Sequence, residues 1–163
     1  MMVKKSQNKS VLFLDFDGVL RTGNSPYRDE FGSLFDPASV HELQRVIESV
    51  NPMIVISSSW KMLGLGVLRE MWRERGLPGR IFGITPSDAS NEMMMRGEMP
   101  DPKLKGAEIQ QWLDEHPEYT HYAILDDEDV AQDDMQRSHL VQTNPSIGIS
   151  SQITDAILVL LMN

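Results

Sequence analysis

The sequence of 163 residues contains no cysteine, and this absence excludes several kinds of chemistry. Without cysteine the chain forms no disulfide, has no thiol nucleophile and offers no thiolate ligand to a metal. Any bound metal must therefore rest on oxygen or imidazole ligands. The absence also agrees with a reducing compartment such as the cytoplasm.

Long hydrophobic runs are absent too, since no apolar stretch reaches the ~20 residues that a membrane-spanning helix requires. The first residues, MMVKKSQNKS, carry no apolar stretch like that of a signal peptide. We therefore expect a cytoplasmic protein with no membrane partner. The length suits one domain, which we place at residues 10–163 behind a flexible N-terminus at residues 1–9.

Positive charge is scarce, with 15 lysines and arginines against 24 aspartates and glutamates and a net charge of -9. Such a surface repels polyanions on average, which argues against an extended nucleic-acid groove. A local basic patch stays open, as does the alternative that the acidity only keeps the protein soluble. The hydrophobic share of 40% excludes a disordered chain and predicts a compact fold.

Short apolar runs without polar alternation predict parallel strands that are buried on both faces. They lie at residues 11–14, 53–56, 81–84, 122–125 and 140–141. Apolar residues at helical spacing predict helices between and after these runs, at residues 37–50, 62–75, 105–116 and 153–161. The alternation predicts an α/β fold, a doubly wound, Rossmann-like parallel sheet of about five strands. Polar composition predicts loops after the first strand and over residues 85–103.

Polar residues follow three of the predicted strands, at residues 15–18, 57–60 and 126–129. In doubly wound sheets ligands bind beyond the carboxyl ends of the strands, near the point where the strand order reverses. We therefore expect these carboxylates and hydroxyls to converge on one site.

Asp15 and Asp17 are two residues apart at the end of an extended segment, so that both side chains can face one site, and Gly18 permits a sharp turn after them. Crowded carboxylates repel one another, which makes the arrangement costly unless a hard cation neutralises it. This pattern predicts Mg²⁺ as the cofactor. The alternative is that both aspartates only form a turn or a helix cap.

The segment at residues 12–20, Leu-Phe-Leu-Asp-Phe-Asp-Gly-Val-Leu, resembles the first motif of the haloacid dehalogenase-like (HAD) superfamily. The resemblance implies that Asp15 attacks phosphorus to form an aspartyl-phosphate. It also implies that Asp17 protonates the leaving group and then activates water. Both would belong to a Mg²⁺-dependent phosphohydrolase.

Two later segments resemble the second and third motifs of this superfamily. Ser57, with Ser58 as the neighbouring alternative, would hold phosphoryl oxygens through its hydroxyl and adjacent N–H groups. Lys105, with Lys103 close enough to be confused with it, would bind the same phosphate from the start of a helix. Without the resemblance, a serine after a strand is an ordinary helix cap and the lysine a solvated surface residue.

Asp126 and Asp127 resemble the paired acids of the fourth motif. By this resemblance Asp126 binds Mg²⁺ together with Asp15 and Asp17. Asp127 supports these ligands without binding the metal itself. Glu128 and the acids that follow it are interpreted as solvated, because a Mg²⁺ site needs only one or two further carboxylates.

The serine, tryptophan and acidic segments are most similar to the HAD domain of the Swiss Army Knife RNA repair group. This resemblance implies a phosphorylated small molecule or a nucleic-acid end as substrate. Residues 21–35 and 85–103 are too short for a large cap domain, so we expect an open site. A non-catalytic metal-binding or regulatory module and a phosphotransferase are the alternatives. Five side chains are candidates for lining the approach, although surface and core positions are the commoner explanation: Arg21, Tyr27, Arg28, Trp60 and Arg96.

Overall fold

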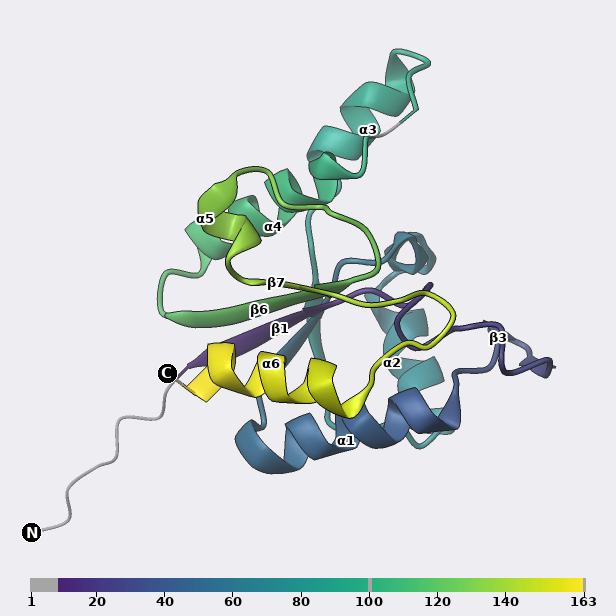
Figure 1. Cartoon of the computed structure of the whole chain (residues 1–163). Coiled ribbons are helices and arrows are strands. Elements are labelled where there is room, and N and C mark those ends of the chain that lie inside the picture. Colours follow the sequence, from purple (N-terminus) through teal and green to yellow (C-terminus); the bar gives the residue numbers. More distant parts are fainter. Residues whose placement is uncertain (1–8, 100, 163) are drawn as a thin grey trace, which may run out of the picture.

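The computed structural model of the chain describes residues 9–99 and 101–162, and a five-stranded parallel sheet forms its centre (Figure 1). In spatial order the strands are β5 (Ile81–Ile84), β4 (Met53–Ile56), β1 (Ser10–Leu14), β6 (His121–Asp126) and β7 (Leu140–Gln142). The chain winds outward from β1 to one edge and then returns to the other side of β1. The strand order therefore reverses at β1, as the predicted doubly wound sheet requires.

Side chains of β1 alternate between two hydrophobic cores. Leu12 and Leu14 belong to the larger core, whereas Val11 and Phe13 belong to the smaller one on the opposite face. Because both faces of the strand are covered, all of its residues are buried. This explains why the strand has no polar alternation in the sequence.

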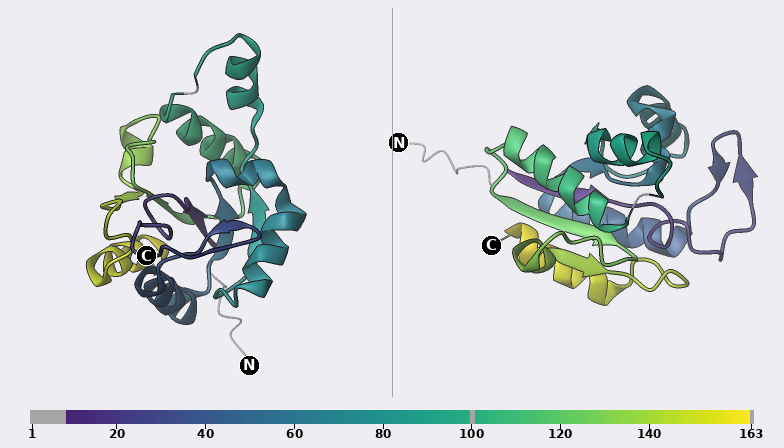
Figure 2. Two further views of the ribbon diagram at one scale, coloured as in Figure 1. Left: turned by 90° about the vertical axis from the view of Figure 1, so that its right-hand side faces the viewer. Right: turned by 90° about the horizontal axis from the view of Figure 1, so that it is seen from above.

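Helices cover the sheet in two layers (Figures 1 and 2). The larger core takes side chains from α1 (Pro37–Val50), α2 (Leu65–Glu74) and α6 (Ser151–Met162), and the smaller core from α4 (Lys103–Glu115). The short helix α5 (Asp134–Arg137) lies between β6 and β7. Among the helices of the described residues, none combines the length and apolar character needed to cross a membrane.

The start of α1 follows its sequence signals. The side chain of Asp36 accepts a hydrogen bond from the Ala38 N–H at 3.0 Å, and Pro37 occupies the first helical position. The second predicted helix begins later than expected. Met62 lies instead in the 3₁₀ helix η1 (Ser59–Leu63), and Gly64, with φ of 88°, separates η1 from α2.

Two segments that were predicted as loops contain regular structure. The first carries a small hairpin of β2 (Arg28–Asp29) and β3 (Gly32–Ser33). The second carries α3 (Asp88–Met95), so the prediction of a loop over residues 85–103 was wrong there. Methionine is a strong helix former, and Gly97 with φ of 75° follows the helix end. Neither segment forms a large cap.

The N-terminal segment predicted as flexible, residues 1–9, lies outside the described residues except for Lys9. The carbonyl of Lys9 accepts a hydrogen bond from the Thr120 N–H at 3.2 Å. The division into this segment and a single domain over residues 10–163 stays a prediction.

Candidate active site

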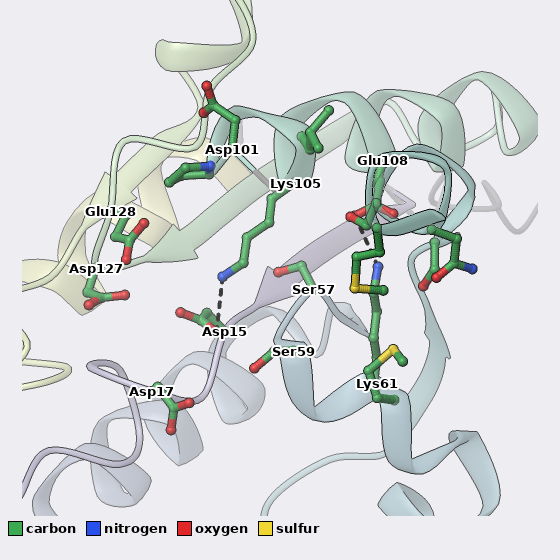
Figure 3. A pocket seen from close by; sticks show the side chains of 17 residues that line it. Asp15, Asp17, Ser57, Ser59, Lys61, Asp101, Lys105, Glu108, Asp127 and Glu128 are labelled. Carbon is green, nitrogen blue, oxygen red and sulfur yellow. Dashed lines mark hydrogen bonds and ion pairs between the residues drawn. The ribbon is translucent and has the colours of Figure 1, made fainter. Parts of the chain in front are cut away.

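A pocket of about 460 Å³ opens at the carboxyl ends of the central strands (Figure 3). Its walls combine residues that follow β1 and β4 with α3, the first turns of α4 and the loop after β6. Asp15, Asp17, Ser57, Lys105 and Asp127 all line it. The strand ends that the sequence singled out therefore meet in one place, beside the point where the strand order reverses.

Asp15 is the most buried carboxylate of the first motif, with 3% of its surface exposed. Its backbone N–H bonds to the Leu125 carbonyl at 3.0 Å, and its Oδ1 accepts the Phe16 N–H at 2.9 Å. Burial, and after it the negative charge of Asp126, raises the pKa of Asp15 to about 8, although the opposite charge of Lys105 limits the rise. The local backbone thus fixes the orientation of the Asp15 carboxylate at the pocket.

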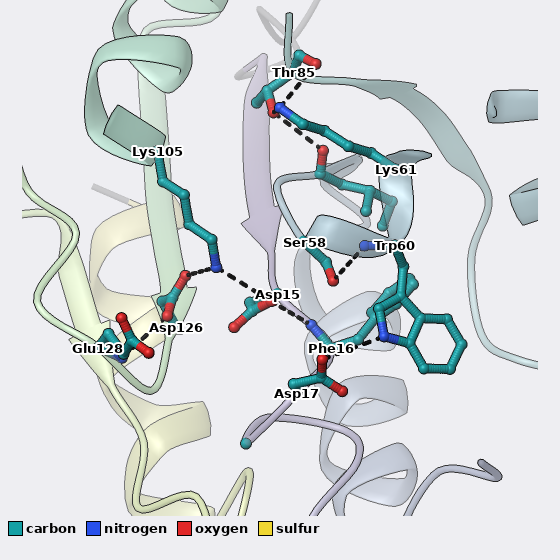
Figure 4. A network of polar contacts seen from close by, with 12 residues as sticks. Asp15, Phe16, Asp17, Ser58, Trp60, Lys61, Thr85, Lys105, Asp126 and Glu128 are labelled. Carbon is teal, nitrogen blue, oxygen red and sulfur yellow. Dashed lines mark hydrogen bonds and ion pairs between the residues drawn. The ribbon is translucent and has the colours of Figure 1, made fainter. Parts of the chain in front are cut away.

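Lys105 bridges two of the buried carboxylates (Figure 4). Its Nζ lies 3.0 Å from Oδ2 of Asp126 and 3.4 Å from Oδ1 of Asp15. Burial lowers the pKa of Lys105, but the attraction of Asp15 and Asp126 outweighs it and leaves the pKa raised. The pKa of Asp126 is raised mainly by its burial, against the effect of Lys105. Lys105 is therefore a fixed cation that faces the pocket.

Three carboxylates come together at this point. Oxygen atoms of Asp15, Asp126 and Asp127 lie within 4.8 Å of one another. Gly18 makes the approach of Asp127 possible, because a Cβ atom at Gly18 would lie 2.5 Å from the Asp127 carboxyl carbon, and its φ of 79° suits glycine. One lysine does not neutralise three such charges. The group therefore fits a hard divalent cation with oxygen ligands.

Asp17 lies beside this group rather than within it. Its carboxylate accepts hydrogen bonds from the Arg21 guanidinium at 3.1 Å and from the Trp60 indole N–H at 3.3 Å. The metal ligands predicted from the sequence were Asp15, Asp17 and Asp126. The cluster in the structure consists of Asp15, Asp126 and Asp127, so that it contains Asp127 where Asp17 was predicted. The carboxylate of Asp17 faces the pocket from the opposite side to Lys105 (Figure 3).

The two serines of the second motif are placed differently. Ser57 lines the pocket, and its buried Oγ has no hydrogen-bond partner among the described residues. Ser58 is turned away into a helix cap, where its Oγ accepts the Trp60 N–H at 3.1 Å. Of the two, Ser57 is the one with a free hydroxyl at the site.

The two lysines of the third motif are also separated by the structure. Lys103 is exposed and is the first residue of α4. Lys105 reaches the carboxylates because α4 approaches the loop after β6 closely at Gly106. A Cβ atom at Gly106 would lie 2.3 Å from the carbonyl oxygen of Val130. The glycine after Lys105 thus brings the helix within reach of Asp126.

The sequence did not predict a second charged pair in the same pocket. Lys61 and Glu108, exposed by only 8% and 2%, form an ion pair at 3.2 Å. Lys61 also donates to the Thr85 hydroxyl at 3.1 Å and to the Pro86 carbonyl at 3.0 Å. Burial lowers the pKa of Lys61, an effect that Glu108 opposes. A signal existed, since Glu108 is three residues after Lys105 and so lies on the same helix face.

The central strand β1 with Asp15 directly after it, the strand order and the acidic group beyond the sheet are those of a HAD-like domain. Comparison with protein families identifies it further. The family described as the HAD domain in Swiss Army Knife RNA repair proteins matches residues 11–153, and the chain belongs to this family. Membership supports a hydrolase or phosphatase at the level of the superfamily. No curated protein and no solved structure matches the chain.

Proposed function

We propose that the chain is a Mg²⁺-dependent phosphomonoester hydrolase in which Asp15 is the nucleophile. The observation that carries this proposal is the environment of Asp15. It is a buried carboxylate, fixed by the Phe16 N–H, within 3.4 Å of the Lys105 ammonium and at the base of the pocket. A carboxylate held in this way is oriented for attack on a phosphoryl group that Lys105 and Ser57 bind.

In the first step an oxygen of Asp15 forms a bond to phosphorus while the bond from phosphorus to the alcohol oxygen breaks. Asp17, in its protonated form, gives a proton to the leaving alkoxide. The products are an aspartyl-phosphate at Asp15 and a free alcohol. Lys105 offsets the negative charge on the phosphoryl oxygens in the transition state.

In the second step the Asp17 carboxylate takes a proton from a water molecule as its oxygen attacks phosphorus. The bond between phosphorus and Asp15 breaks, which releases inorganic phosphate and regenerates the Asp15 carboxylate. Asp17 ends the cycle protonated, as it began. Its hydrogen bonds to Arg21 and Trp60 orient it for both transfers.

Asp15, Asp126 and Asp127 would hold the Mg²⁺ ion, because their oxygen atoms form the crowded acidic group. When bound, Mg²⁺ neutralises charge on the carboxylates and on the phosphoryl group. Asp17 was predicted as a further ligand, but its carboxylate is engaged by Arg21 and Trp60. We therefore assign Asp17 to proton transfer.

A phosphorylated nucleic-acid or nucleotide end is the substrate that we propose, because the family is described by its occurrence in RNA repair proteins. The absence of a large cap over the described site agrees with a phosphate on a bulky molecule. A phosphotransferase would use the same residues, and a metal-binding module would keep the fold without turnover. The cytoplasmic location stays a prediction from the composition.

Phosphate release from a panel of substrates tests the proposal. The panel contains p-nitrophenyl phosphate, a sugar phosphate, a nucleotide and phosphorylated oligonucleotides, each with Mg²⁺ and with chelator. Wild-type protein should release phosphate only with Mg²⁺, and Asp15→Asn should lose more than about 10⁴-fold in turnover. The matched control is Asp155→Asn, the same change at an exposed position of α6, which should keep full activity. Undiminished release by folded Asp15→Asn contradicts the nucleophile assignment.

A further inference from the structure

A second groove, of about 340 Å³, adjoins the catalytic pocket. We call it the hairpin groove, because it lies between the β2–β3 hairpin and η1. Ser59 and Met62 line both hollows, so that the groove begins where the pocket ends. The hairpin stands away from the body of the molecule on that side (Figure 2).

The walls of the hairpin groove combine cations with aromatic rings. Arg21 and Arg28 line it together with Phe31 and Trp60. Within residues 9–99 and 101–162, the Arg28 side chain has no ion pair, although the net charge of the protein is -9. Met62, with 67% of its surface exposed, adds an apolar surface. Proteins bind single strands with this combination, cations for phosphates and flat or apolar surfaces for bases.

The opposite rim of the catalytic pocket has the opposite charge. Asp101 and Glu128, which are outside the group of carboxylates assigned to Mg²⁺, line that side (Figure 3). A second phosphate group near these carboxylates is repelled. One near Arg28 is attracted, because Arg28, unlike Arg21 with its ion pair to Asp17, has no carboxylate partner among the described residues. For a polyanion whose end lies at Asp15, the charges therefore favour the hairpin groove over the acidic rim.

Contacts between the hairpin and the body of the molecule fix the shape of this groove. Arg75 donates to both carboxylate oxygens of Asp29, at 2.8 and 2.7 Å, and to the Gly32 carbonyl at 3.2 Å. The Arg75 guanidinium lies 4.8 Å above the ring of Phe35. Gly32 in turn packs close to Trp60, where an added Cβ atom would lie 3.5 Å from the indole ring. The groove is thus formed before a ligand arrives, which lowers the entropic cost of binding.

We infer that the hairpin groove binds the nucleotide next to the phosphorylated end of a single-stranded nucleic acid. This inference rests on the proposed function and names its substrate class. The end phosphate lies at Asp15, and the first phosphodiester faces Arg28. The neighbouring base covers the apolar and aromatic surface at Met62 and Trp60. The contact is short and local, as a protein with excess negative charge requires.

Substrates of increasing length test this inference. The series is a mononucleotide, a dinucleotide and a trinucleotide, each phosphorylated at its 3′ or at its 5′ end, and p-nitrophenyl phosphate is the internal reference. Addition of the second nucleotide should raise kcat/KM, relative to the reference, by about tenfold for one of the two polarities. The third nucleotide should add less, because the groove accommodates only one.

Arg28→Gln should remove most of the gain from the second nucleotide. It should also lower the slope of log kcat/KM against log salt concentration by about one, because one phosphate contact is lost. The matched control is Arg80→Gln, which removes the same charge just before β5, at the opposite end of the sheet from the site. This control should keep the gain. The inference is wrong if wild-type protein shows no gain, or if Arg28→Gln and Arg80→Gln behave alike. Preference for a duplex end over a single strand also overturns it.

A failure of the proposed function is distinguishable from a failure of the groove. If no substrate, p-nitrophenyl phosphate included, releases phosphate, the proposed function is wrong. Fluorescence anisotropy with a labelled, end-phosphorylated trinucleotide then tests the groove alone. Weaker binding by Arg28→Gln than by Arg80→Gln supports the groove, and equal binding by the two variants contradicts it.

Discussion

Two lysines, Lys61 buried and Lys105 half-buried, face the same pocket, and their surroundings differ in charge. Lys105 lies between Asp15 and Asp126, with Asp127 close by, so that the group as a whole is negative. Lys61 is paired with Glu108 alone and is otherwise held by neutral oxygens such as those of Thr85. The pKa of Lys105 is accordingly raised, whereas burial lowers the pKa of Lys61.

This difference separates a site that attracts ions from a site that holds the fold together. The Lys105 group has more carboxylates than cations, and a divalent metal and a phosphate can complete it. The Lys61 pair is balanced within the protein and joins η1 to α4 across the pocket wall. Burial of a lysine and a carboxylate does not by itself mark a catalytic site, and the excess of charge is the more informative feature.

Of the changes that test this comparison, Lys105→Met should produce the largest effect on turnover, a loss of about 10³-fold in kcat, because it removes the cation that faces the phosphoryl group. The same change leaves the carboxylates of Asp15 and Asp126 without their ion pair, so that stability without metal should fall and Mg²⁺ should restore it. Steady-state kinetics and thermal unfolding measure the two effects. Near-normal kcat in the folded variant would show that Lys105 is not part of the active site.

The pH dependence of stability should distinguish the two groups in the metal-free protein. The pKa of Asp15 in the folded chain is about 8, above its value in an unfolded chain, so the folded state binds the proton more tightly. The stabilisation that protonated Asp15 gives the folded state is complete below about pH 4 and is lost as the pH rises toward about 8. Over this range the free energy of unfolding should fall by up to ~1.4 kcal/mol per pH unit. Urea unfolding in chelator measures it.

Two controls sharpen this prediction. Asp15→Asn should flatten the pH dependence, and saturating Mg²⁺ should remove the loss at high pH because the metal stabilises the ionised carboxylates. Glu108→Gln should change the stability without flattening the slope. If wild-type protein and Asp15→Asn show the same slope, Asp15 is not the group that opposes folding.

Lys61→Met should cost about 3 kcal/mol of stability, because it leaves the buried Glu108 carboxylate without a cation. The double variant Lys61→Met/Glu108→Gln should recover much of that loss. Because the loss is structural, the Mg²⁺ concentration that gives half-maximal activity should stay near the wild-type value. A large shift in this Mg²⁺ requirement, with stability unchanged, would reverse the assignment of the two lysines.

Trp60→Phe should have the smallest effect, about tenfold on turnover of substrates with poor leaving groups, because it removes one hydrogen bond to Asp17. p-Nitrophenyl phosphate should be affected less, since its leaving group needs little protonation. Trp72→Phe is the matched control, because the Trp72 indole N–H donates to the Pro78 carbonyl, away from Asp17. Equal losses for both classes of leaving group would exclude a role for Trp60 in proton transfer.

The sequence predicted the sheet and the position of its site because both depend on local patterns. Each central strand is a short apolar run, and a parallel sheet brings the carboxyl ends of such runs together. The prediction of a doubly wound sheet of about five strands is confirmed. The helix α3 was missed because it packs against α4 rather than the sheet and none of its residues is buried, so that no apolar periodicity marks it.

Details of the site depend on contacts between distant residues and were not predictable from local patterns. Asp127 enters the acidic group because Gly18 leaves room for its side chain, and these residues lie on different strand ends. Trp60 bonds to Asp17 across 43 positions of the chain, and Lys61 to Glu108 across 47. The folded geometry alone decides such pairs.

The central claim is that Asp15 carries the phosphoryl group between the two steps. Asp17→Asn tests it most directly, because this variant slows the attack of water while p-nitrophenolate still leaves without an acid. In rapid-quench experiments with p-nitrophenyl phosphate and Mg²⁺, we predict a burst of one p-nitrophenolate per protein molecule. Mass spectrometry should then find the phosphoryl group on the peptide that contains Asp15. Turnover in which phosphate appears together with p-nitrophenolate from the first cycle, with no phosphorylated peptide, would contradict the claim.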